Sequence, residues 1–174
     1  KTVTLQILAE GFAAAGVPVF ITDVKGDLSG LAENSKMEDF LVKRAEMIGL
    51  DPYAPHAVPV IFWDMFGAQG HPVRTTISEM GPLLLSRLME LNETQQGVLD
   101  VVFRVADDQG LLLLDIKDLR AILTFVAENA ADISKEYGNV AGASIAAIQR
   151  ALLRLEEQGG EKFFGEPAVN LQDF

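Results

Sequence analysis

The chain has 174 residues, no cysteine and a net charge of −11 at neutral pH. This length suits one domain with a sizeable core, or a small domain with an appendage. The lack of cysteine excludes disulfides and thiolate metal sites, and it fits a reducing compartment. The sequence shows no signal peptide and no apolar run of about 18 residues, the length that would cross a membrane. We therefore expect a cytoplasmic globular protein that makes no membrane contact.

The negative charge is concentrated in the second half of the chain. Residues 1–77 contain 6 basic and 9 acidic residues, a net charge of −3. Residues 78–174 contain 8 basic and 16 acidic residues, a net charge of −8. Proteins that bind nucleic acid usually present a basic face. The composition therefore gives no support for a DNA-binding surface in this chain.

The first predicted element is a helix that begins at the pair Lys1-Thr2 and stops near Gly16. A Lys-Thr pair is how a phosphate-binding P-loop, G-x-x-x-x-G-K-[ST], passes into its helix. The helix has a broad apolar face, which predicts that it lies against a sheet. This face comprises Val3, Leu5, Ile7, Leu8 and Phe12.

A continuous apolar run at residues 17–21 follows, which is typical of a buried parallel strand. Asp23 comes just after it, and ligands of open α/β sheets bind at the carboxyl ends of strands. We therefore expect Lys1, Thr2 and Asp23 to converge on one crevice. Lys1 would neutralise phosphate oxygens, the Thr2 hydroxyl would bind Mg²⁺, and Asp23 would hold a metal-bound or attacking water.

The residues themselves leave a second interpretation open for each of these positions. Lys1 and Thr2 also fit an exposed, frayed terminus. Asp23 also fits a turn or cap residue within the stretch DVKGD, which is rich in turn-forming residues.

The next segment predicts one helix and two short strands. Ser35 and Glu38 fit a capping box, S-x-x-E, for a helix that ends at Gly49. Residues 60–63 form a second apolar strand that ends in Asp64, and residues 72–77 return as a short strand, which we expect to be antiparallel. For Asp64 we favour a turn role over a ligand role.

From Ser78 onward the sequence predicts mostly helices. Asn92 and Asp115 are good N-caps for the second and third of these helices. The expected spans are 83–91, 93–107, 116–131, a short turn at 132–137, and 140–157. The four leucines before Asp115 also describe a Walker B strand, but helical neighbours and the absence of a following Glu favour a buried connection.

Three long stretches of the sequence resemble the bacterial HerA-like ATPases of the YjgR type, in the HerA–FtsK branch of P-loop motor ATPases. They are KTVTLQILAEGFAAAGVPVFITDVKGDLSGLA, PVIFWDMFGAQGHPVRTTISEMGPLLLSRLMELNETQQGVLDVVFRVADDQGLLLLDIKDLRAIL and GGEKFFGEPAVNLQDF. The resemblance covers nearly the whole chain, and the long middle stretch is its most specific part.

The resemblance implies an α/β fold, a partial RecA-like P-loop sheet in three αβα layers with a mostly helical insertion. Residues 1–77 would be the first part of the ATPase core, 78–165 the insertion, and 166–174 a return segment toward the core. The family's P-loop glycines are expected upstream, and its Walker B Asp-Glu and arginine finger beyond residue 174. This part alone would then not turn over ATP.

The resemblance also implies site residues and partners. Lys1 and Thr2 would bind ATP, Thr2 and Asp23 would bind Mg²⁺, and Asp23 and Asp27 would be catalytic. The parent protein would form a homo-oligomer, a hexameric ring in many relatives, and DNA enters only by analogy across the superfamily. The alternative function is a non-catalytic module, in which the helices of 78–165 serve assembly or partner binding and the nucleotide site is vestigial.

Overall fold

The computed structural model describes residues 1–50, 52–170 and 172. The protein is mostly helical, with 56% of its residues in helices and 4% in strands. The chain forms two compact units, Lys1–Ile61 and Phe62–Phe174. No helix of the described residues has both the length and the apolar character needed to cross a bilayer.

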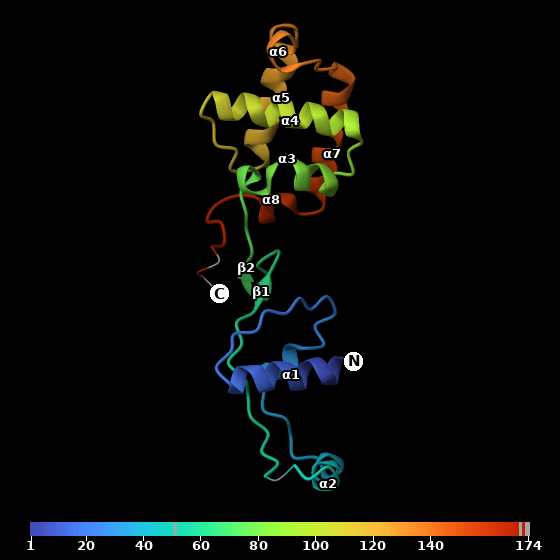
Figure 1. The fold of residues 1–174 in the computed structure, drawn as a ribbon, viewed down its shortest axis with the longest axis vertical. Coiled ribbons are helices and arrows are strands. Elements are labelled where there is room, and N and C mark those ends of the chain that lie inside the picture. Colours follow the sequence, from blue (N-terminus) through green and yellow to red (C-terminus); the bar gives the residue numbers. More distant parts are fainter. Residues whose placement is uncertain (51, 171, 173–174) are drawn as a thin grey trace. The chain divides into compact units, whose positions relative to one another are not determined.

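The first unit contains three helical elements and a small apolar interior. Figure 1 shows α1 (Thr2–Ala14) and α2 (Asp39–Met47), and the 3₁₀ helix η1 (Ser29–Ala32) lies between them in the sequence. Among the described residues of this unit, the buried apolar side chains are Ala9, Leu31 and Ala45. The backbone N–H of Val58 donates to the Leu31 carbonyl at 2.9 Å, which fixes the returning chain against η1.

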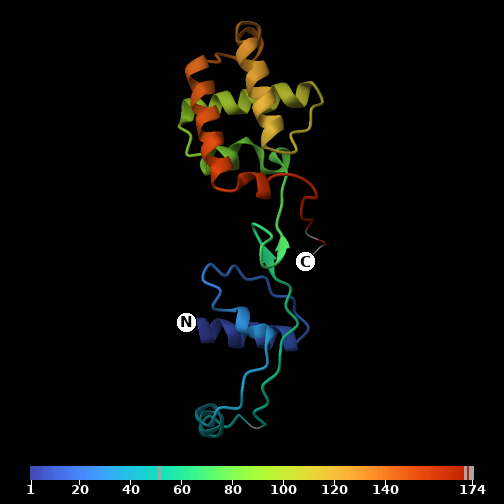
Figure 2. The ribbon, with the colours of Figure 1, turned by 180° about the vertical axis from the view of Figure 1, so that it is seen from behind.

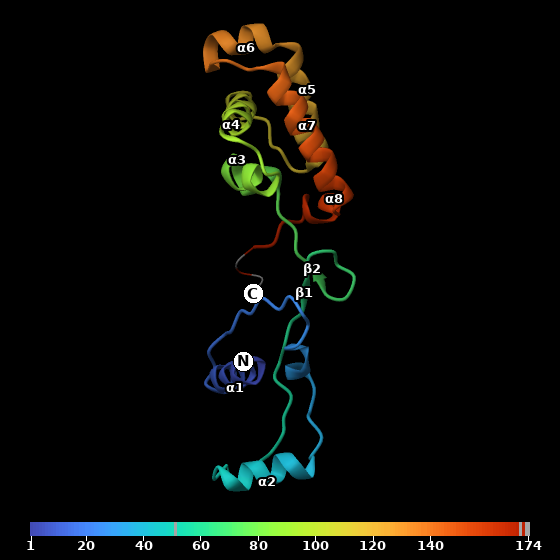
Figure 3. The same ribbon diagram turned by 90° about the vertical axis from the view of Figure 1, so that its right-hand side faces the viewer.

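The second unit is a helical bundle that follows two very short strands. Figure 3 shows α3 and α4 on one side of the bundle and α5 and α7 on the other. Helix α4 packs against α3 and α7, and α5 packs against α7. The elements are β1 (Trp63–Asp64), β2 (His71–Pro72), α3 (Ile77–Leu88), α4 (Glu93–Asp108), α5 (Ile116–Glu128), α6 (Ala130–Tyr137), α7 (Gly142–Glu157) and α8 (Gly160–Phe163).

Three helices of this bundle begin at complete capping boxes, in which the N-cap and N3 side chains each accept a hydrogen bond from the other's backbone N–H. They start α3, α4 and α5. The two predicted caps, Asn92 and Asp115, are confirmed. The third pair, Thr76 and Glu79, fits the same sequence signature, although a strand was expected to continue to residue 77.

The core of the bundle is continuous and fully buried. Helices α3, α4, α5 and α7 each contribute side chains with almost no exposed area. Members with at most 1% exposure include Leu85, Leu99, Val102, Leu119, Leu123, Ile148 and Leu152. Each fully buried Leu or Ile contributes about 1.5–3 kcal/mol. Helices α4, α5 and α7 form close to their expected limits, whereas α3 begins at Ile77, six residues before the predicted start at residue 83.

The chain enters and leaves the bundle side by side. The Thr75 N–H donates to the Phe163 carbonyl at 3.0 Å, and the Gly165 N–H donates to the Thr75 carbonyl at 2.9 Å. Phe164 lies between these bonds and is 1% exposed, within the bundle core. Figure 2 shows the segment before α3 and the segment after α8 at the same end of the helices.

The predicted three-layer αβα sheet is wrong. The structure is mostly helical, and its named strands form one two-stranded sheet. Within it, β1 pairs with β2 in parallel, with Trp63 opposite His71. An apolar run indicates only a preference for a half-buried extended chain. A sheet also requires neighbouring strands that pair with that segment.

Several local predictions also fail. Residues 17–21 are not in a strand, and Phe20 is 72% exposed. Helix α2 begins at Asp39 without a side-chain cap, so Ser35 does not cap it. The return strand is parallel rather than antiparallel, because the intervening loop curls around the Asp64 carboxylate.

Candidate functional site

The predicted phosphate-binding residues lie at the beginning of α1. Lys1 is the N-cap residue, and its side chain makes no capping hydrogen bond. The first turn contains no acidic residue. The first N–H groups of a helix lack partners within it, and the aligned peptide dipoles make this end positive. A free cationic side chain beside such an end suits an anionic ligand.

Asp23 organises the loop that follows residues 17–21. Its Oδ2 accepts the Leu28 N–H at 2.8 Å, and its Oδ1 accepts the N–H groups of Gly26 at 3.0 Å and Lys25 at 3.3 Å. Gly26 has a φ of +75°, a conformation that glycine adopts without strain. The turn role that the sequence left open for Asp23 is therefore present in the structure.

These hydrogen bonds keep the Asp23 carboxyl ionised. The backbone N–H of Leu28 is the main cause that lowers the pKa of Asp23 below its usual value of 3.8, and N–H groups of Lys25 and Gly26 add to it. An ionised carboxylate offers about four lone-pair positions. The three backbone donors occupy most of these positions, and the Asp27 N–H is a further cause of the lowered pKa, so the Asp23 carboxylate is largely committed to its own loop.

Asp27 lies in the same loop, and the loop is tied to α1. The side-chain amide of Gln6 donates to the Asp27 carbonyl oxygen at 3.2 Å. Gln6 is one helical turn after Thr2, and residues four apart in a helix share a face, with Cβ atoms about 5–6 Å apart. The structure therefore brings the Asp23–Leu28 loop to the face of α1 that carries Thr2.

Sequence reasoning missed the residue that makes this connection. Gln6 is half-buried, as is Thr2, and Ala9 on the same face is buried. The apolar face that we expected to pack is exposed instead, with Val3 at 65% and Ile7 at 62%. The spacing of Thr2, Gln6 and Ala9 along the helix was the available signal, but a face of small and polar residues is easily overlooked beside an apolar one.

The oxygen donors of this region fit magnesium by type. Mg²⁺ prefers oxygen ligands and is usually held by one or two carboxylates together with substrate phosphates and water. A threonine hydroxyl and two aspartates are such donors. Within the described residues, no group of three or more His, Cys, Asp or Glu is arranged to hold a metal ion. Any cation bound here would depend on further oxygens from its ligand.

Asp64 repeats the Asp23 arrangement in the second unit, and the turn role that we favoured is confirmed. Its Oδ2 accepts the N–H groups of Ala68 at 2.7 Å and Gln69 at 2.9 Å, and its Oδ1 accepts that of Phe66 at 3.0 Å. The Phe66 N–H is the main cause that lowers the pKa of Asp64, and Lys162 contributes at longer range.

Asp115 is a helix cap and does not end a strand. Its Oδ1 accepts the N–H groups of Lys117 at 2.7 Å and Asp118 at 3.1 Å. The preceding leucines form an irregular connection, in which Leu113 is buried and Leu112 is 74% exposed. The prediction that this segment is a connection and not a Walker B strand is confirmed, although only part of the connection is buried.

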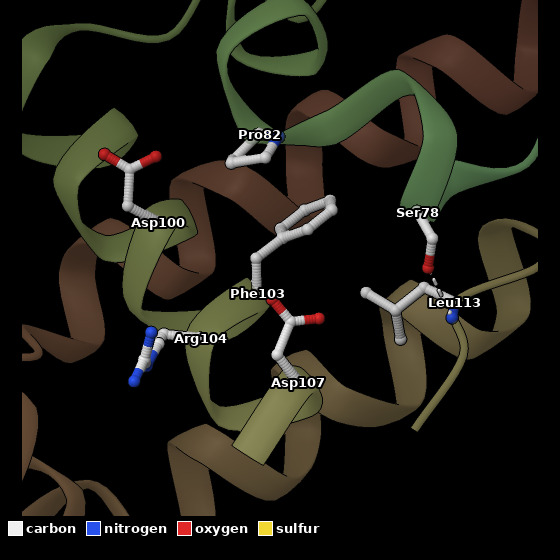
Figure 4. Close-up of a pocket in the computed structure, with 7 residues that line it drawn as sticks. All are labelled: Ser78, Pro82, Asp100, Phe103, Arg104, Asp107 and Leu113. Carbon is white, nitrogen blue, oxygen red and sulfur yellow. Dashed lines mark hydrogen bonds between the residues drawn. The ribbon is translucent and has the colours of Figure 1, made fainter. Parts of the chain in front are cut away.

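The bundle carries a separate hollow of about 260 Å³ that the sequence did not reveal. Figure 4 shows four lining side chains that project from α4, with Ser78 bonded to the Leu113 N–H at 2.9 Å. The α4 residues are Asp100, Phe103, Arg104 and Asp107. Their spacing of three, four and seven positions marks one helix face, which is the signal that was available.

The comparison with protein families now identifies the class. The model of the family described as Helicase HerA-like C-terminal matches residues 1–174. The chain therefore belongs to the HerA-like helicase family, and the resemblance noted from its sequence is confirmed. No curated protein and no solved structure matches the chain.

Proposed function

We propose that this chain is the nucleotide-binding part of a HerA-family motor ATPase. One observation carries the proposal: the loop with Asp23 and Asp27 is hydrogen-bonded through Gln6 to the face of α1 that carries Thr2, one turn from the N-cap residue Lys1. The cation, the hydroxyl and the carboxylates that metal-assisted phosphoryl transfer uses are therefore grouped in one unit.

The roles follow from the chemistry of each side chain. Lys1 and the N-terminal N–H groups of α1 bind the ATP phosphates, and the Thr2 hydroxyl is a ligand of Mg²⁺. Asp23 would bind the metal or hold a metal-bound water. Asp27 is exposed and orients the attacking water. Thr2 and Asp23 would hold the ion, which would supply charge neutralisation at the phosphates, and Asp27 would hold the water in place.

The wider assembly is part of the same proposal. A HerA-family motor would act as a homo-oligomer, with a hexameric ring as the expected form. DNA as the substrate rests on the analogy with the superfamily, because the charge of −8 on residues 78–174 does not favour DNA contact here.

The test is nucleotide turnover by the intact protein and by its Lys1→Ala variant. Losing a donor that stabilises the transition-state charge should lower kcat by about 10²-fold or more. Lys36→Ala is the matched control, since Lys36 is exposed and lies outside the loop and α1. Equal turnover by the wild type and Lys1→Ala would refute the assignment.

An exposed apolar face on α3 supports the alternative, an assembly module. Leu83, Leu84 and Leu88 are each about half exposed, at 51%, 52% and 50%. Single exposed leucines are ordinary, but three on one helix favour a contact surface. Light scattering on the intact protein and on a Leu84→Lys/Leu88→Lys variant tests this function. An unchanged mass would exclude α3 as the assembly surface.

A further inference from the structure

We infer that Gln6 is a positioning residue. It holds the backbone of Asp27, in the acidic loop of residues 23–28, against α1, so that a movement of α1 on nucleotide binding also moves the Asp27 carboxylate. This inference rests on the proposed function. Gln6 itself touches neither ATP nor the metal. It acts through the backbone of Asp27.

The loop of residues 23–28 is braced internally at its ends. The Asp23 carboxylate accepts hydrogen bonds from the N–H groups of Gly26 and Leu28, and the Ser29 hydroxyl donates to the Gly26 carbonyl at 2.8 Å. These bonds fix the shape of the loop. They lie within the loop and do not determine where it sits on the helix.

Gln6 attaches this braced loop to α1. Its amide nitrogen reaches the Asp27 carbonyl at 3.2 Å, across 21 positions of sequence. Holding the backbone carbonyl leaves the Asp27 carboxylate uncommitted, and that side chain is exposed. A donor that binds the backbone of an acidic residue positions the residue without neutralising it.

Gln6 is also close to the N-terminus of α1, where phosphate binding is expected. One helical turn separates Gln6 from Thr2, about 6 Å along the axis. A displacement of the first turn of α1 by a bound nucleotide therefore reaches Asp27 through one side chain. A misplacement of about 1 Å at a reacting group can cost about 10²-fold in rate.

The test uses the intact protein with Gln6→Met, which keeps the length of the side chain and removes its donor. Losing one exposed hydrogen bond should lower kcat about three- to tenfold. Asp27→Asn should lower kcat by about 10²-fold or more. If Gln6 acts through Asp27, the double variant should match Asp27→Asn alone, and the Kd for a non-hydrolysable ATP analogue with Mg²⁺ should stay within about twofold.

A readout without turnover accompanies the kinetics. Amide hydrogen exchange in residues 25–29 should be about three- to tenfold faster in Gln6→Met than in the wild type. Glu10→Gln is the control, because Glu10 is half-buried on the same face of α1, one turn further along. It should leave both the exchange and kcat unchanged.

The outcomes separate the two proposals. A wild-type protein that binds no ATP overturns the proposed function and this inference with it. With wild-type turnover intact, rate effects that multiply in the double variant overturn the role of Gln6 alone. Unchanged exchange in residues 25–29 also overturns it, since the loop would then not depend on Gln6.

Discussion

Replacement of Asp115 separates a structural from a catalytic role at a position that fits two sequence patterns. In the structure, a single carboxylate oxygen, Oδ1, accepts both the Lys117 and Asp118 N–H groups. The helix that it starts buries Ile116 and Leu119 almost completely, at 1% and 0% exposure. Asp115→Ala removes both bonds, whereas Asp115→Asn keeps an oxygen at the same place.

The structure sets the expected magnitudes. Replacing an N-cap residue by Ala costs about 0.5–2 kcal/mol, and with two N–H groups released we expect the upper part, about 1–2 kcal/mol. Asn is as good an N-cap as Asp, so Asp115→Asn loses only the charge near the helix dipole, about 0.5 kcal/mol. Neither change should affect ATP turnover at temperatures where the bundle stays folded.

The assay pairs urea unfolding, followed by circular dichroism, with ATP turnover on the same samples of the intact protein. We expect the urea midpoint to fall in the order wild type, Asp115→Asn, Asp115→Ala, with equal kcat. An Asp115→Ala protein with an unchanged midpoint would refute the cap interpretation, and abolished turnover in Asp115→Asn would show that the carboxylate does chemistry.

Two further sets of variants test packing and electrostatics. Gly160→Ala should destabilise the bundle by about 1–3 kcal/mol in thermal unfolding, because its Cβ would lie 2.7 Å from the Leu155 carbonyl oxygen and 2.9 Å from Ile116 Cδ1. Gly97→Ala is its control within α4: no atom lies within 4 Å of the added Cβ, so we expect stabilisation of about 0.5–1 kcal/mol, and a loss there would contradict the packing. The pKa of Asp64 is lowered in the folded protein, so the stability that its carboxylate contributes is complete above the unfolded value near 3.8 and is lost as the pH falls through the lower folded pKa. The difference in urea midpoint between the wild type and Asp64→Asn should therefore be constant above about pH 5 and shrink below 3.8; a difference that grew on acidification would show that the sign is wrong.

The parts of the fold that the sequence predicted well are those coded by neighbouring residues. The caps at Asn92 and Asp115 lie within four positions of the groups that they bind. The amphipathic patterns of α4 and α7 repeat along each helix, and both helices form close to their expected limits. These signals need no knowledge of distant segments.

The failed strand predictions depended on distant partners, whereas the capping box at Ser35 failed although its signal is local. The run at residues 17–21 has the composition of a strand, but its hydrogen bonds would have to come from elsewhere in the chain. The same limit applies to Thr75, whose partner at Phe163 lies beyond the whole bundle. No local pattern contains that pairing.

At the candidate site, the sequence predicted the helix itself but not the face of the helix that the protein covers. Periodicity in α1 correctly grouped Val3 with Ile7, but it did not reveal which face the protein covers. The covered face begins with Thr2 and continues through Gln6 to Ala9. That face meets the loop of residues 23–28 through the hydrogen bond from Gln6 to the Asp27 carbonyl.

The two units therefore respond differently to substitution. In the bundle, the large buried core carries the stability, so the loss of one cap is a small part of the total. In the described residues of the first unit, the buried side chains Ala9, Leu31 and Ala45 provide little packing. The acidic loop there keeps its shape through polar bonds from Asp23 and Gln6. Exchange in that loop should then respond to a single hydrogen bond, while exchange in the bundle core should respond only to the loss of packed volume.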